Sequence, residues 1–168
     1  MANDLATQST HDIALDTEQD TEDFVTFKVG TQLFGVHVLN VRDILHLEKI
    51  AFIPLAPPQV AGSINLRGQI VTVVDVRVCL GLTTQSVRLE DNDEEAPIGV
   101  TIEKGSDLYT LLVDEIGDVL SVAEEQKEPV PNTIDDRWRA YATCVYRLEG
   151  ELLIVLDSDR LADPNLDN

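Results

Sequence analysis

Residues 60–82, VAGSINLRGQIVTVVDVRVCLGL, decide the fold of this chain. Two runs rich in β-branched residues, 64–67 and 70–75, flank Gly68 and Gln69, and glycine readily adopts the positive φ of a tight turn. We therefore predict a β-hairpin with a two-residue loop at Gly68 and Gln69. This register pairs Arg67 with Ile70, Leu66 with Val71, Asn65 with Thr72, Ile64 with Val73 and Ser63 with Val74.

The pleat of this hairpin divides its side chains between two faces. The apolar face, which we predict to be core, carries Ile64, Leu66, Val71 and Val73. The mixed face carries Ser63, Asn65, Arg67, Ile70, Thr72 and Val74. A mixed face either packs under another part of the chain or is open to a partner protein. Arg67 beside Ile70 and Asn65 favours a partner, although an arginine on a strand is as often merely solvated.

Composition limits the possible functions. The 168 residues suit one ordinary domain or two small ones, and 43% are hydrophobic, which is enough for a core. The formal charge of −19 opposes binding to nucleic acid or to an anionic membrane. No apolar run approaches the roughly twenty residues of a membrane span, and no secretory signal is visible, so we expect a cytoplasmic protein without membrane insertion. Cys79 and Cys144 form no C-x-x-C pair, and we expect both to be small buried residues.

The chain before the central hairpin contains three further predicted segments. Residues 1–22 are acidic and poor in apolar side chains, so we predict a disordered tail. Residues 24–29 and 32–38 predict a hairpin around Gly30, with alternate side chains inward. Residues 38–45 carry apolar side chains at helical spacing and predict a short helix. A proline-marked extended connection then leads to residue 60.

The second half repeats the pattern of the first. Residues 83–96 form an acidic linker, more typical of a solvated loop than of a cation site. Beyond them, Gly105 aligns with Gly30, and residues 148–157 align with residues 66–75. We predict one small β-rich subdomain from residues 23–82, another from residues 97–163, and a tail at 164–168. Each subdomain would be a closed five-stranded barrel, which makes the fold class all-β.

The repeat also separates structural residues from functional candidates. Asp75 and Asp157 are shared by the two halves, so we predict that each accepts backbone N–H bonds at the end of a strand. Arg67, by contrast, aligns with Glu149. Because the fold does not require arginine at this position, Arg67 is a functional candidate.

No arrangement of residues in the sequence indicates catalysis. The three histidines lack metal-ligand spacing, and no nucleophile elbow or phosphate-binding loop is present. Trp138 is more typical of packing under a loop than of a recognition anchor. We therefore predict no catalytic residue, no metal site and no cofactor, and we give a hydrolase or metal enzyme little weight.

Residues 57–77 follow the pattern P-x-x-V-x-G-x-x-N-L-R-G-x-I-V-x-V-x-D-x-R, and the sequence there resembles the CheW family. The block at residues 24–45 and V-D-E-I-G-D-V-L at residues 113–120 extend the resemblance. It implies two SH3-like five-stranded barrels with short helices and no catalytic activity. It also implies an adaptor, monomeric when free, that links the cytoplasmic tips of chemoreceptors to the CheW-like regulatory domain of the histidine kinase CheA.

The resemblance also implies which residues bind partners. Matching positions carry over Arg67, Gly62, Val41 and Asp43 on the predicted helix, and Val119 on its second-half counterpart. Asn65 and Ile70 join them as neighbours of Arg67 on the mixed face. Val41 also belongs to the predicted core stripe, which places it at the rim of the interface. The alternative function is a double-barrel module that binds a small ligand and has no signalling role.

Overall fold

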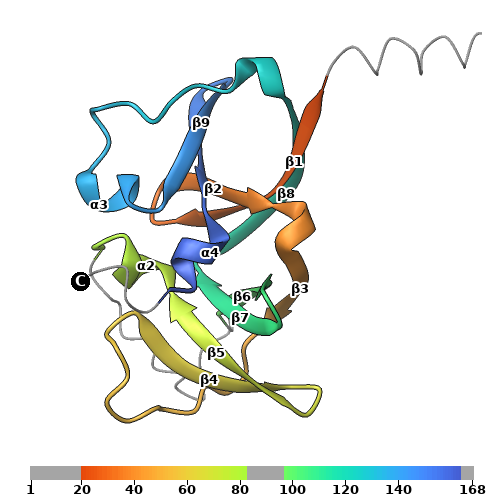
Figure 1. The fold of residues 1–168 in the computed structure, drawn as a ribbon, viewed down its shortest axis with the longest axis vertical. Helices are drawn as coiled ribbons and strands as arrows, with labels where there is room; N and C mark the ends of the chain where they lie inside the picture. The colour runs from red at the N-terminus through yellow and green to blue at the C-terminus, as the bar shows by residue number, and fades with distance from the viewer. Residues whose placement is uncertain (1–19, 83–96, 164–168) are drawn as a thin grey trace, which may run out of the picture.

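The computed structural model describes residues 20–82 and 97–163, which form ten strands in two five-stranded sheets (Figure 1). The first sheet has the order β8-β1-β2-β10-β9, with bounds β8 (Glu115–Ala123), β1 (Thr21–Val29), β2 (Gln32–His37), β10 (Glu151–Leu156) and β9 (Ala142–Leu148). The second sheet has the order β3-β6-β7-β5-β4, with bounds β3 (Val41–His46), β6 (Ile98–Lys104), β7 (Asp107–Val113), β5 (Gln69–Asp75) and β4 (Val60–Leu66). The predicted all-β class is confirmed.

Short helical segments connect or follow the strands. Their bounds are η1 (Val38–Asn40), α2 (Val76–Cys79), η2 (Glu124–Gln126), α3 (Asp136–Arg139) and α4 (Ser158–Leu161). The carboxylate of Asp75 accepts a hydrogen bond from Arg77 N at the start of α2. At the start of α4, Asp157 accepts from Asp159 N and Arg160 N. The predicted structural role of the two repeated aspartates is confirmed.

Each sheet combines strands of both sequence halves, which corrects the prediction of one barrel for each half. The first sheet joins β1 and β2 to β8, β9 and β10, whereas the second joins β6 and β7 to β3, β4 and β5. Four pairings make this exchange: β2 with β10 and β5 with β7 are parallel, and β1 with β8 and β3 with β6 are antiparallel. The repeat identifies equivalent strands, but it does not determine which strands pair with each other. The side-chain pattern of a strand is compatible with pairing in either sheet.

The core consists of three clusters of buried side chains. The largest draws on both sheets and includes Phe27, Phe34, Ile102 and Leu111. Two smaller clusters each belong to one sheet, around Tyr146 in the first and around Val71 in the second. The large shared cluster holds the two sheets together as one unit, with an expected hydrophobic contribution of about 1.5–3 kcal/mol for each large buried side chain.

Residues 38–45 do not form the predicted helix. Only Val38–Asn40 form a helical turn, η1, and the following residues form β3, which pairs with β6 along its length. The counterpart helix expected around Val119 is also a strand, β8, paired with β1. Both segments are rich in β-branched residues, and pairing with a neighbouring strand outweighs their weak helical periodicity.

The turn of the central hairpin lies one residue earlier than predicted, so the partner of each strand residue shifts by two. Leu66 pairs with Gln69 and Asn65 with Ile70, so the loop residues are Arg67 and Gly68. Their φ values are 53° and 86°, and positive φ at both loop residues is the signature of a type I′ turn, which matches the twist of the strands. A shift of two residues leaves the predicted faces intact, but Arg67 becomes a turn residue.

The folded part of the chain begins closer to the N-terminus than predicted. Residues 20–22 were assigned to the disordered tail, but β1 begins at Thr21 and pairs there with Ala123 of β8. Residues 1–19, 83–96 and 164–168, which include the rest of the predicted tail, the acidic linker and the C-terminal tail, lie outside the described residues.

The predictions for tryptophan and cysteine are confirmed. Trp138 packs within the chain, since its Nε1 donates to Leu80 O at 2.8 Å and its ring meets Phe34 at 5.3 Å. Cys79 and Cys144 are both buried.

Candidate functional site

Arg67 stands at the tip of the β4–β5 hairpin with its side chain 84% exposed. Its Nη2 lies 3.3 Å from Oδ2 of Asp43 on β3. The turn is fixed from within, because Asn65 Oδ1 accepts a hydrogen bond from Gly68 N at 2.8 Å. The local sequence N-L-R-G therefore presents the guanidinium group outward with most of its donors turned to solvent.

Ile70 adds an apolar side chain to the same surface. It is 70% exposed and lies directly across the ladder from Asn65. The mixed face of the hairpin is open here, whereas Val74 near its other end is buried in the large shared cluster. The mixed face is therefore packed within the chain at one end and exposed at the other, and a partner on the exposed end stays a prediction.

A hollow of about 420 Å³ adjoins Asn65 and Ile70. Its walls come from β3, the following segment and the central hairpin, and its lining residues are Leu45, His46, Leu47, Glu48, Lys49, Ala51, Ser63, Ile64, Asn65 and Ile70. The lining mixes apolar side chains with charges of both signs, so the hollow offers room for a partner side chain beside Arg67.

The predicted site residues on β3 differ in their accessibility. Asp43 is half-buried, and its Oδ1 accepts from Ile44 N while its Oδ2 faces Arg67. Val41 is also half-buried and packs against the large shared cluster, which agrees with a position at the rim. The side chain of Asp43 thus connects β3 to the tip of the β4–β5 hairpin through its contact with Arg67.

Val119 lies on the other sheet. It is 58% exposed on β8 and pairs across the ladder with Val25. The repeat makes Val119 of β8 equivalent to Ile44 of β3, and Ile44 is 42% exposed. The two edge strands therefore present equivalent apolar side chains, one on each sheet. Ile44 is not among the predicted site residues, although the alignment of Gly30 with Gly105, extended along the chain, places Ile44 on Val119.

Gly62 is buried at a bulge in β4, where the ladder shifts between Val60 and Gly62. It has φ 150°, and a Cβ atom here would lie 2.3 Å from Ala51 O and 2.7 Å from Ile50 Cγ2. Ala51 forms a β-bridge with Ser63, so the chain before β4 crosses directly against this glycine. The geometry gives Gly62 a role in backbone packing.

The segment before β4 exposes apolar side chains that were not predicted as site residues. Phe52 is 82% exposed, and Leu55 is fully exposed with φ 62°. Ala56 N donates to Ile53 O at 3.4 Å, so Pro54 and Leu55 are the central residues of a turn. Positive φ at the third position of such a turn is usually supplied by glycine or asparagine, so leucine here is strained.

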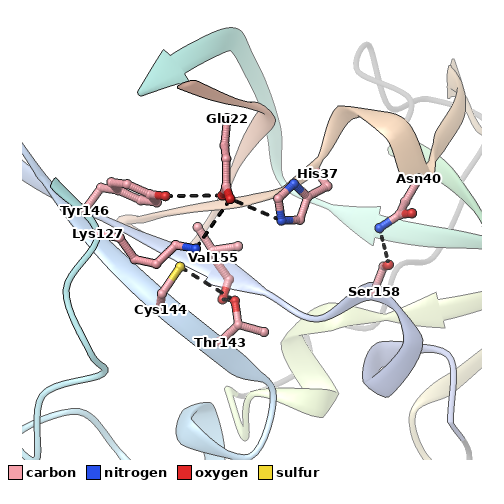
Figure 2. Close-up of polar contacts among 9 residues, drawn as sticks. All are labelled: Glu22, His37, Asn40, Lys127, Thr143, Cys144, Tyr146, Val155 and Ser158. Atoms are coloured by element: carbon pink, nitrogen blue, oxygen red, sulfur yellow. Dashed lines mark hydrogen bonds and ion pairs between the residues drawn. The ribbon is translucent and has the colours of Figure 1, made fainter. Parts of the chain in front are cut away.

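A polar cluster surrounds Glu22 at the start of β1 (Figure 2). Its carboxylate accepts from Tyr146 Oη at 3.3 Å and from Lys127 Nζ at 3.4 Å, and His37 Nε2 lies 3.9 Å away. Burial, with the nearby Glu22 charge, raises the pKa of the Tyr146 hydroxyl, and burial raises the pKa of the Cys144 thiol. Both groups are therefore neutral at physiological pH, and the cluster joins strands without an activated nucleophile.

Two general features of the described residues bear on function. Residues 20–82 and 97–163 contain no group of three or more side chains that could hold a metal ion. Within the same ranges, no helix has the length and apolar character needed to cross a membrane.

Comparison with known proteins identifies the family. A chemotaxis protein CheW of Rhizobium meliloti is 29% identical over 137 residues, covering 82% of this chain and 84% of the relative. A chemotaxis protein CheW of Klebsiella aerogenes is 29% identical over 140 residues, covering 83% and 81%. The crystal structure of the scaffolding protein TtCheW from Thermoanaerobacter tengcongensis shares the fold, with TM-score 0.73, 24% identity, and coverage of 87% of this chain and 95% of that one. Residues 23–164 match the CheW-like domain, and the chain belongs to the CheW-like family.

Proposed function

We propose that this protein is a non-catalytic adaptor that couples chemoreceptors to the histidine kinase CheA in chemosensory signal transduction. The observation that carries the proposal is the exposed group of Arg67, Asn65 and Ile70 beside Asp43, in a chain of the CheW-like family. The curated relatives that match most of this chain are named chemotaxis proteins CheW. The partners we propose are the cytoplasmic receptor tips and the CheW-like regulatory domain of CheA.

Arg67 suits a partner that presents carboxylates or backbone oxygens. Its guanidinium lies 3.3 Å from the carboxylate of Asp43, and a salt bridge of such a strongly exposed side chain contributes little to folding. Buried against a partner, the same group can donate several hydrogen bonds, and its loss then costs roughly 2–5 kcal/mol of binding free energy if it is fully desolvated. Ile70 next to it supplies apolar contact.

The equivalent apolar side chains of Ile44 and Val119 extend the proposed surface over both sheets. A protein with two related surfaces can engage two partners through several modest contacts, and their linkage raises the overall avidity. Val41 lies at the rim of this surface in the proposal. We also propose that the protein is cytoplasmic. We propose that it is monomeric when free, since a formal charge of −19 opposes association with a second copy.

Co-sedimentation tests the function. The purified protein is mixed with a receptor cytoplasmic fragment and CheA, and kinase autophosphorylation is recorded with wild type and Arg67→Glu. We expect wild type to form a receptor-controlled kinase complex and Arg67→Glu to lose it.

Arg147→Glu is the matched control for this experiment. Arg147 is also an exposed arginine with a carboxylate partner, Glu128, but it lies on β9 of the other sheet. We expect Arg147→Glu to form the complex with the receptor fragment and CheA as wild type does. Wild type that binds neither partner would overturn the proposal.

A further inference from the structure

The two sheets are joined at two junctions that the repeat makes equivalent (Figure 1). At one junction, Asp114 alone separates β7 of the second sheet from β8 of the first. At the other, η1 leads from β2 of the first sheet to β3 of the second. A short helix accompanies each junction: α2 contacts the first through Arg77, and α4 contacts the second through Ser158.

The junction at Asp114 is held by a charged, bidentate contact. Arg77 Nε lies 2.9 Å from Asp114 Oδ1, and Nη2 lies 2.5 Å from Oδ2. The same Oδ2 accepts from Gly30 N at 2.7 Å, and Asp114 N donates to Lys28 O at 3.0 Å. Lys28 and Gly30 belong to the β1–β2 hairpin of the first sheet, whereas Arg77 follows β5 of the second. One carboxylate therefore ties the two sheets together.

The surroundings of this ion pair make it stronger than a surface pair. The side chains of Arg77 and Asp114 are 23% and 31% exposed, so solvent and salt screen them less than they screen fully exposed pairs. Bidentate geometry also fixes the relative orientation of the two groups, which a single hydrogen bond does not.

The equivalent junction at η1 is held by a neutral contact. Asn40 Nδ2 donates to Ser158 Oγ at 3.1 Å, as Figure 2 shows. A hollow of about 310 Å³ lies beside this bond, lined by both residues and by Glu22, His37 and Lys127 among others. Neutral hydrogen bonds contribute less than charge-assisted bidentate ones, so the contact of α4 with its junction is weaker than the contact of α2 with the other.

We propose that Arg77 and Asp114 form a positioning clamp that fixes the angle between the two sheets and thereby the separation of Ile44 and Val119. β8 starts at the residue after Asp114, so movement of this junction shifts the whole strand that carries Val119. Ile44 belongs to the other sheet, on β3. The consequence for partner binding rests on the proposed function, whereas the effect on the angle between the sheets does not.

Distance measurement between spin labels tests the clamp directly. Labels at Asp107→Cys on β7 and Glu151→Cys on β10 occupy exposed positions on central strands of different sheets. Unsubstituted protein gives the labelling background, because Cys79 and Cys144 are buried. We expect Asp114→Asn to broaden or shift the distance distribution while the circular dichroism spectrum stays unchanged.

Further variants separate the clamp from general destabilisation. Arg77→Lys keeps the charge without the bidentate fork and should give a smaller change, and combining Arg77→Gln with Asp114→Asn should add little to either alone, because the pair acts as a unit. Glu103→Gln removes the Arg42–Glu103 pair within the second sheet and should leave the distribution unchanged. Gly68→Ala lowers stability at a distant turn and should also leave it unchanged.

The outcomes for the clamp and for the adaptor function are distinguishable. A distance distribution in Asp114→Asn as narrow as that of wild type, with the fold intact, overturns the clamp. Where wild type binds the receptor fragment, we expect Asp114→Asn to weaken binding about five- to tenfold, and unchanged binding overturns the link to the interface. If wild type binds no partner, the adaptor function is refuted. The spin-label distances in Asp114→Asn still test the clamp in that case.

Discussion

Substituting Gly62 by alanine separates backbone packing from partner contact at this position. The added Cβ would lie 2.3 Å from Ala51 O and 2.7 Å from Ile50 Cγ2, closer than real Cβ atoms approach other atoms. Ala51 O is a backbone atom held by its hydrogen bond from Ser63 N at 2.9 Å, so it cannot move aside without breaking the bridge. The substitution should therefore displace the segment before β4.

The magnitude combines two costs. A non-glycine residue at φ 150° costs of the order of 1–3 kcal/mol in backbone strain. Relief of the overlap adds roughly 1–3 kcal/mol, as for overpacked cores. We expect Gly62→Ala to lower the free energy of unfolding by about 2–5 kcal/mol, a large part of the stability of a domain of this size.

Urea unfolding followed by circular dichroism measures this change, with Gly150→Ala as the control. Gly150 has φ 85°, and its Cβ would meet nothing within 4 Å, so its substitution carries the backbone strain alone. The difference between the two variants gives the cost of the overlap together with the extra strain of φ 150° over φ 85°. If Gly62→Ala kept its stability and instead lost partner binding, the glycine would be a contact residue and the packing argument would be refuted.

Three other substitutions test separate features. Arg67→Glu should change the free energy of unfolding by less than about 1 kcal/mol, because the side chain is 84% exposed, and a cooperative loss of structure would show that the arginine is structural. Leu55→Asn should raise the free energy of unfolding by about 0.5–1 kcal/mol, since Leu55 is fully exposed at φ 62°; lower stability in urea would mean that the leucine packs. Burial opposes ionisation of Asp114, but hydrogen bonds from Arg77 and Gly30 outweigh it and lower the pKa of the carboxyl. Its stabilisation is therefore present above the unfolded pKa of about 3.9 and lost as pH falls through the lower folded value, so Asp114→Asn should lose less stability than wild type between pH 5 and pH 2.

Local patterns predicted the strands well where side chains and turns agreed. Around Gly30, period-two alternation and a glycine that can adopt positive φ indicated a hairpin, and this hairpin forms, as does the equivalent one around Gly105. The prediction of a helix after His37 was wrong because the spacing of Val41, Ile44 and Leu45 also fits one face of a helix. Its partner strand β6 lies more than fifty residues away, beyond the reach of any local pattern.

The candidate site could be predicted only where its residues lie close together in the sequence. Arg67, Asn65 and Ile70 are close in sequence, and their exposure follows from one hairpin. The contact between Arg67 and Asp43 depends on how β3 and the hairpin are placed in the second sheet, which residue order alone does not give. The strained turn at Leu55 was hidden because leucine gives no signal of positive φ.

The exchange of strands between the two halves explains why the chain forms one unit. Neither half contains a complete sheet, because each supplies two strands to one sheet and three to the other. A separated half would leave strand edges and the large shared cluster exposed, so it should not fold alone.

The same exchange puts the two junctions between the sheets at equivalent places in the repeat. Once the halves had diverged, one junction could carry the ion pair of Arg77 and Asp114 and the other the neutral contact of Asn40 and Ser158. An internal repeat thereby gives two equivalent connections between the sheets that are supported by contacts of different chemistry.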